Sequence, residues 1–146
     1  MKTQAYDNMF RMTVICIDSY ENMIPCGRIY NMFLESGIAF RGTIELLKNM
    51  ESMLEEINIP QSFSSRRVFW QSQEPKEPVK VSSEIMVGAK GTFSLRILFR
   101  QNASWQGSVL WHEGRREESF RSVLELLFLL DSALSMESSG KDAEVK

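Results

Sequence analysis

The sequence predicts an α+β domain in which a ββα unit occurs twice, with one antiparallel sheet and both helices packed on one face around a pseudo-twofold axis. The main observation is an internal repeat. FRGTIELLKNMESML (40–54) aligns without gaps to FRSVLELLFLLDSAL (120–134), at an offset of 80 positions, and seven of the fifteen positions are identical. The same offset continues upstream, where it pairs Ile15 with Leu95 and Gly27 with Gly107. The repeat is therefore longer than one helix.

Each copy begins with two runs in which apolar and polar residues alternate, the pattern of a half-buried strand. These runs are 13–18 and 25–31 in the first copy, and 92–101 and 104–113 in the second. Polar turn residues separate the members of each pair, so each pair predicts a β-hairpin. The next segment changes to helical spacing, and in the first copy one core-facing stripe contains Ile44, Leu46, Leu47, Met50, Met53, Leu54 and Ile57.

The 146 residues predict a single domain, because this length supports one hydrophobic core. Its parts are repeat 1 at about 12–57, an insertion at 58–91, repeat 2 at about 92–137 and a disordered tail at 138–146. The insertion contains QSQEPKEPVK, which predicts a loop. Its flanks, 65–70 and 79–87, are rich in β-branched or aromatic residues and are candidates for additional strands.

Composition and charge exclude several classes of protein. Hydrophobic residues make up 43% and charged residues 25%, as in folded globular domains, and the net charge of −2 gives no overall basic field for a polyanion or an anionic membrane. The N-terminus shows no secretory pattern, and the most apolar stretch, 123–134, is too short to span a membrane. We therefore expect a cytoplasmic protein with two reduced cysteines, Cys16 and Cys26, and no membrane association.

The predicted sheet has one face under the helices and one open face. In the second hairpin, one parity is assigned to the helix side: Phe93, Leu95, Ile97, Phe99, Trp105, Val109 and Trp111. The open face of the two hairpins then carries Arg28, Tyr30, Arg96, Arg100 and His112. Because arginines suit phosphates and flat rings suit unpaired bases, these residues predict a binding face for single-stranded nucleic acid. The same mixture also fits a face that is solvated or covered by another segment or protomer.

The second helix differs from the first on its outer side, where Thr43, Lys48 and Asn49 are replaced by Val123, Phe128 and Leu129. A helix that is apolar nearly all round has to be enclosed, by the insertion, the N-terminal arm or a second copy across a twofold axis. The alternative prediction is therefore a protein-interaction or assembly module. We expect it to form a homo-oligomer through Val123, Phe128 and Leu129.

No residue pattern predicts catalysis, a cofactor or a metal site. The single histidine, His112, is next to Glu113, but neighbouring strand residues point to opposite faces and do not form an acid–base pair. Cys16 and Cys26 face each other only if the first hairpin turn centres on Glu21, and two separate free thiols are the simpler expectation. The sequence therefore predicts a non-enzymatic binding module.

Two short motifs resemble those of the PilZ domains that bind cyclic di-GMP. Residues 102–107 read NASWQG and match N-x-S-x-x-G, and Arg96 with Arg100 forms R-x-x-x-R. In that family the arginine pair lies well upstream of the second motif, whereas here it lies in the strand just before it. The resemblance implies a cyclic-dinucleotide binder as a remote alternative. Duplicated sheets with helices on one side are also broadly similar to the whirly single-strand binders, at the level of architecture.

Overall fold

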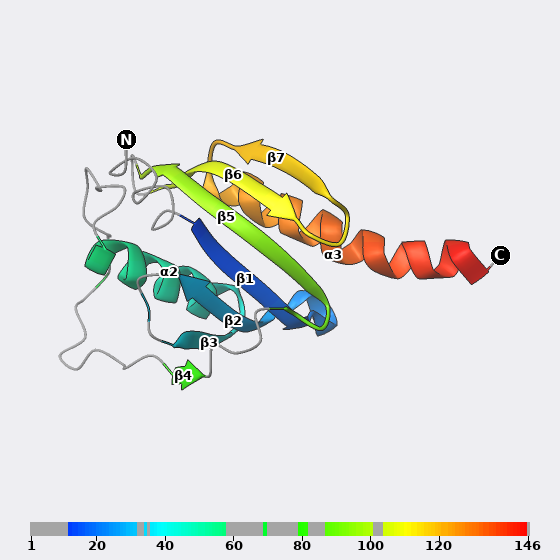
Figure 1. Cartoon of the computed structure of the whole chain (residues 1–146), viewed down its shortest axis with the longest axis horizontal. Coiled ribbons are helices and arrows are strands. Elements are labelled where there is room, and N and C mark those ends of the chain that lie inside the picture. Colours follow the sequence, from blue (N-terminus) through cyan, green and yellow to red (C-terminus); the bar gives the residue numbers. More distant parts are fainter. Residues whose placement is uncertain are drawn as a thin grey trace.

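A computed structural model describes residues 12–31, 34, 36–57, 69, 79–81, 87–100 and 104–145 (Figure 1). The first half of the chain (12–57) contains β1 (Met12–Ser19), a 3-10 turn η1 (Glu21–Met23), β2 (Cys26–Asn31), β3 (Gly37–Arg41) and α2 (Thr43–Ile57). The second half (91–145) contains β5 (Gly91–Phe99), β6 (Gln106–Trp111), β7 (Arg116–Phe120) and α3 (Val123–Val145). One short strand, β4 (Val79–Val81), comes between the halves in the sequence.

The strands form one sheet in the order β4-β3-β2-β1-β5-β6-β7, and each neighbouring pair is antiparallel. Its centre is the pair of β1 and β5, where Ile15 lies opposite Phe93. Each half extends outward from this centre. The α+β class, the antiparallel sheet and the two helices are confirmed.

Each half contains a third strand, so the predicted ββα unit is wrong and the observed unit is βββα. The third strands, β3 and β7, have five residues each. In REESF (116–120) no alternation marks a strand, and four of the five residues are exposed. Its buried phenylalanine, Phe120, lies three positions before the first residue of the helix and resembles the start of the helical stripe, as Phe40 does in the first half.

One hydrophobic core joins the sheet to both helices. Its strand residues occupy alternate positions and include Ile15, Ile17, Ile29, Phe93, Leu95, Ile97 and Val109. Its helix residues include Leu46, Met50, Met53, Leu126, Leu130 and Leu134. Because alternate residues of a strand point to the same face, both helices pack on one face of the sheet, and neither lies on the opposite face, which is called the open face below.

A β-bulge interrupts the pairing at the same relative place in both hairpins. The register shifts between Ile17 and Ser19 in β1, and between Ile97 and Phe99 in β5. The facing residues are two glycines, Gly27 and Gly107, whose Cα atoms lie so near the neighbouring strand that an added methyl group would collide with a backbone carbonyl oxygen.

The bulge in β5 also changes which side chains face the helices. An extra residue on one strand shifts the alternation of side chains by one position. As a result Phe99, predicted to lie under the helices, is 52% exposed, and that prediction is wrong. The other predicted helix-side residues of the second hairpin lie in the core or pack against it.

The insertion contributes β4, which pairs with the outer edge of β3 and sets Lys80 opposite Ile38. The candidate strand at 65–70 lies outside the described residues except for Phe69. The second helix, α3, continues to Val145, through residues for which the sequence predicts a disordered tail, and its last turns project beyond the sheet (Figure 1). Within the described part of the chain, neither helix has the length and apolar character needed to cross a membrane.

Candidate interaction surfaces

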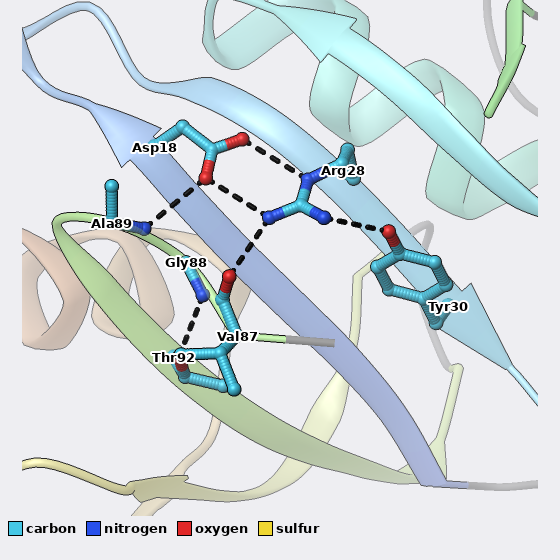
Figure 2. A network of polar contacts seen from close by, with 7 residues as sticks. All are labelled: Asp18, Arg28, Tyr30, Val87, Gly88, Ala89 and Thr92. Atoms are coloured by element: carbon cyan, nitrogen blue, oxygen red, sulfur yellow. Dashed lines mark hydrogen bonds and ion pairs between the residues drawn. The ribbon is translucent and has the colours of Figure 1, made fainter. Parts of the chain in front are cut away.

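The open face of the first half carries a charge pair between Asp18 of β1 and Arg28 of β2. The Nε of Arg28 donates to one carboxylate oxygen of Asp18 and an Nη to the other, both at 3.0 Å. The other Nη donates to the hydroxyl of Tyr30 at 2.8 Å, and Tyr30 is itself buried (Figure 2). Desolvation alone would lower the pKa of Arg28, but the hydrogen bonds and electrostatic interactions with Asp18 and Tyr30 together outweigh this effect and raise the pKa.

The chain segment 87–90 crosses this same face (Figure 2). The carbonyl oxygen of Val87 accepts a hydrogen bond from Arg28 at 2.9 Å, and the N–H of Ala89 donates to Asp18 at 3.1 Å. Gly88 passes so near β1 that a methyl group on it would collide with the backbone of Ile17. Segment 87–90 therefore covers this end of the open face and holds the Arg28 guanidinium within the fold.

Among the described residues, the open face of the second half is less covered by other segments of the chain. Ser94 and Arg96 of β5 are half-buried, and His112 is exposed, with its Nε2 atom 2.7 Å from the hydroxyl oxygen of Ser94. The Nε of Arg96 is buried and has no hydrogen-bond partner among the described residues. Of the five residues predicted to bind nucleic acid, Arg96 and His112 are the two that lie on this less covered part of the face.

Arg100 lies on the helix side of the sheet, so its predicted place on the open face is wrong. The bulge in β5 reverses the alternation before this residue, and its side chain is 2% exposed. It donates to Glu51 at 3.0 Å and to Glu55 at 2.6 Å, both on α2, and the indole N–H of Trp105 also donates to Glu51. Arg96 and Arg100 therefore do not converge as a pair, which removes the geometry that the PilZ resemblance implies.

A related contact occurs at the corresponding place in the first half, just after the end of β1. The hydroxyl of Tyr20 donates to a carboxylate oxygen of Asp131 on α3 at 2.6 Å. Burial, the hydrogen bond to Asp131 and the charge of Asp131 raise the pKa of Tyr20 to about 12. In the repeat alignment Tyr20 corresponds to Arg100, and Asp131 corresponds to Glu51. Each half thus fastens the end of its first strand to the helix of the other half.

The outward side of α3 carries two apolar side chains one helical turn apart, Leu124 and Phe128, which are 59% and 64% exposed. Of the three residues predicted to mediate self-association, Phe128 is exposed, whereas Val123 and Leu129 are partly buried against the core. Comparison of the two helices misses Leu124, because the corresponding residue of α2, Ile44, is equally apolar.

An apolar pocket of about 140 Å³ lies between α3 and strands β5 to β7. Three lining residues, Arg116, Glu118 and Ser132, are exposed, and Arg116 is 3.5 Å from Glu118 in an ion pair, so they mark the mouth of the pocket. The indole N–H of Trp111 is buried and lacks a hydrogen-bond partner within the described residues. The apolar lining consists of Phe93, Val109, Trp111, Leu129, Leu130 and Ala133.

The two cysteines do not face each other. Cys16 lies opposite Arg28, and Cys26 lies opposite Ser19, because the hairpin turn is centred beyond Glu21, near Asn22. Both thiols are free, and Cys16 is buried. Burial raises the pKa of the Cys16 thiol to about 11, although the charge of Arg28 opposes the rise.

His112 and Glu113 have separate partners. His112 contacts Ser94, whereas the carboxylate of Glu113 accepts the backbone N–H of Thr92 at 2.9 Å. The two side chains therefore do not form an acid–base pair. Among the residues whose placement is described, no group of three or more histidines, cysteines, aspartates or glutamates is arranged to hold a metal ion.

Sequence reasoning missed the acidic partners of both arginines. Asp18 has the same parity as Cys16, so it lies on the open face, and it belongs to the same hairpin as Arg28. Opposite charges on paired strands could therefore have predicted this ion pair from the sequence. The partnership of Arg100 with Glu51 depends on the bulge and has no such signal. Comparison with known proteins adds no assignment, because the chain matches no family model, no curated protein and no solved structure.

Proposed function

We propose that this chain is a non-enzymatic protein-interaction module that self-associates through the outward side of α3. The observation that carries the proposal is the exposure of Phe128 beside Leu124. Burying one such side chain contributes about 1.5–3 kcal/mol. The residue of α2 that corresponds to Phe128 is Lys48, so the helix of the first half is polar where α3 is apolar.

A second copy of the chain is the partner that fits this surface best. The 23 residues of α3 exceed the 15 of α2, and its last turns lie beyond the sheet (Figure 1). Two such helices can cross about a twofold axis, so that the same apolar pair on each copy covers the pair on the other.

Light scattering over a wide range of protein concentration tests this proposal. The parent chain is expected to change from monomer to dimer mass, and Phe128→Lys, which installs the residue found in α2, is expected to remain a monomer. Ile44→Lys is the matched control, because Ile44 is 70% exposed on α2 and lies outside the proposed interface. A Phe128→Lys chain with the parent mass, or a parent that stays monomeric throughout, overturns the proposal.

A second candidate function is binding of single-stranded nucleic acid by the open face of the second half. It is favoured by Arg96, whose Nε lacks a partner among the described residues, and by the exposed His112, which directly follows β6 and contacts Ser94. Aromatic stacking by Tyr30 and phosphate contacts by Arg28 and Arg100 are not part of this narrower proposal, because these three side chains are held within the fold.

Fluorescence anisotropy of a short labelled single strand tests the nucleic-acid candidate. Arg96→Ala is expected to weaken binding and to reduce the slope of log affinity against log salt by about one. Arg41→Ala is the control, because it removes the same charge from an exposed position at the end of β3. Equal effects of the two variants, or no binding at low salt, remove this candidate.

We further infer that the halves arose by duplication of one βββα unit and are related by a pseudo-twofold axis between β1 and β5. Three features support this inference, because each recurs at the offset of the sequence repeat: the bounds of β2 and β6, the two bulges, and the strand ends that contact the opposite helix.

A further inference from the structure

The outer edge of β7 differs from the corresponding edge in the first half. There β3 is paired with β4, residue by residue from Gly37 to Ala39. The sheet ends at β7, and within the described ranges nothing pairs with its outer side. A free strand edge presents unpaired N–H and C=O groups to which another strand can bind.

The backbone groups of Glu117 and Ser119 point outward from this edge. The N–H of His112 donates to the carbonyl of Thr92 at 3.0 Å, so the even-numbered residues of β6 are those hydrogen-bonded to β5. Its odd-numbered residues then bond to positions 116, 118 and 120 of β7, with which they are paired. This leaves Glu117 and Ser119 turned outward, and the corresponding residues of β3, Gly37 and Ala39, face β4.

The apolar pocket opens at this same edge. Two exposed residues at its mouth, Arg116 and Glu118, belong to β7 and lie on the helix side of the sheet, opposite Trp111 and Val109. A strand added to β7 would place alternate side chains on the helix side. The residue of that strand opposite Glu118 would therefore lie at the mouth of the pocket.

We propose that β7 binds an extended segment of another protein, which pairs antiparallel with it and inserts a large apolar side chain into the pocket. In the bound segment, the residue next to the inserted side chain lies on the open face, opposite the exposed Glu117, and is therefore basic. A second copy of β7 fits poorly, since antiparallel pairing about its centre sets Glu118 against Glu118, and like charges opposite each other destabilise a sheet. This site is separate from the outward side of α3 and does not depend on self-association.

Nuclear magnetic resonance spectra of the ¹⁵N-labelled full chain test this proposal. The probe is an acetylated and amidated peptide in which lysines alternate with valines around one central phenylalanine. Its addition is expected to shift the backbone amide signals of Glu117 and Ser119 together with the indole N–H signal of Trp111, and all three shifts are expected to saturate at the same peptide concentration. Spectra of Trp111→Phe assign the indole signal.

Two variants of equal charge decide whether the edge is the site. Glu117→Lys is expected to lower the affinity for the peptide by about fivefold or more, because the attraction between Glu117 and the peptide lysines becomes a repulsion between lysines. Glu56→Lys, on the exposed surface of α2, is expected to leave its affinity unchanged. Ser119→Pro, which removes an outward N–H but no bond to β6, is expected to weaken binding as well.

Several outcomes overturn the proposal. Equal weakening by Glu117→Lys and Glu56→Lys would mean that the peptide responds to overall charge alone. A shift of the Trp111 indole without shifts at Glu117 and Ser119 would mean that the pocket takes a side chain or small molecule without strand pairing. Edge amides that move with protein concentration before any peptide is added would identify a second copy as the occupant.

Discussion

The two halves of the molecule share one sequence of elements but fill the space under their outer strands differently. In the first half Asn31 donates to Thr13 at 3.2 Å and to the carbonyl of Met12 at 3.0 Å, and Ile38 is buried beneath β3. The residues that correspond to Thr13, Asn31 and Ile38 in the second half are Phe93, Trp111 and Glu118, and they line the pocket. The same backbone plan thus gives a filled and covered edge on one side, and an apolar pocket beside an unpaired strand on the other.

The largest expected effect is on stability, and it distinguishes the two contacts that join a strand end to the helix of the other half. Arg100→Ala leaves Glu51 without its buried cation and is expected to lower the free energy of unfolding by about 3 kcal/mol. Tyr20→Phe removes one hydrogen bond and is expected to cost about 1 kcal/mol. Urea denaturation followed by circular dichroism measures both losses. Equal losses would contradict the view that the Arg100 contact stabilises the fold more than the Tyr20 contact.

The next largest effect is expected from substitutions at the two bulges, which test whether the bulges are equivalent. Gly27→Ala and Gly107→Ala each place a methyl group against a backbone carbonyl, and each is expected to cost about 2 kcal/mol. Ser119→Ala, an exposed strand substitution, serves as the control in the same denaturation experiments. A large loss at one glycine with none at the other would show that the halves are less alike than their registers indicate.

A substitution that makes the second half resemble the first is expected to have a smaller effect on stability. Glu118→Ile introduces the residue found at the corresponding buried position, Ile38, and is expected to raise the free energy of unfolding by about 1 kcal/mol through apolar burial in the pocket. It is also expected to block the peptide shift of the Trp111 indole. Glu117→Ile, on the open face, is the control, and an equal gain in both variants would assign the effect to strand propensity.

The smallest effect at neutral pH concerns Tyr20 and Cys16, whose pKa values rise to about 12 and about 11 in the fold, from 10.0 and 9.0. Because both groups hold their protons more tightly when folded, their contribution is full below pH 9 and is lost as the pH rises through these values. The urea midpoint is expected to fall as the pH is raised from neutral to alkaline values, and to fall less in Tyr20→Phe. An identical alkaline fall in both chains would contradict the assignment to Tyr20.

Much of this architecture follows from the repeat and its periodicity, and the misses have local physical causes. The hairpins and helix starts were predictable, because alternation and helical spacing are strong in those segments. Strand β7 was not, since REESF is short, exposed and charged. The bulge in β5 determines which face Phe99 and Arg100 lie on, and no side-chain pattern in the sequence predicts a bulge. The glycines at 27 and 107 are the one related sign, because each lies very close to the neighbouring strand.

The site predictions separated in the same way. Arg96 and His112 lie before the bulge or on the partner strand, where simple alternation holds, and they are on the predicted face. Arg28 also lies on that face, but its partner Asp18 and segment 87–90 occupy its guanidinium. Which surface stays uncovered depends on such long-range contacts, and a single sequence does not contain that information in its periodicity.

The contacts between strand ends and opposite helices also set the order in which the chain becomes a folded protein. The partner of Tyr20 lies 111 positions further along the chain, so it leaves the ribosome long after β1. Until β5 is made, the first half lacks the strand that completes the centre of its sheet, and until α3 is made it also lacks the contact of Tyr20. Contacts of such long range close large loops and form slowly. We therefore expect the chain to fold after synthesis in one cooperative step, with neither half stable alone.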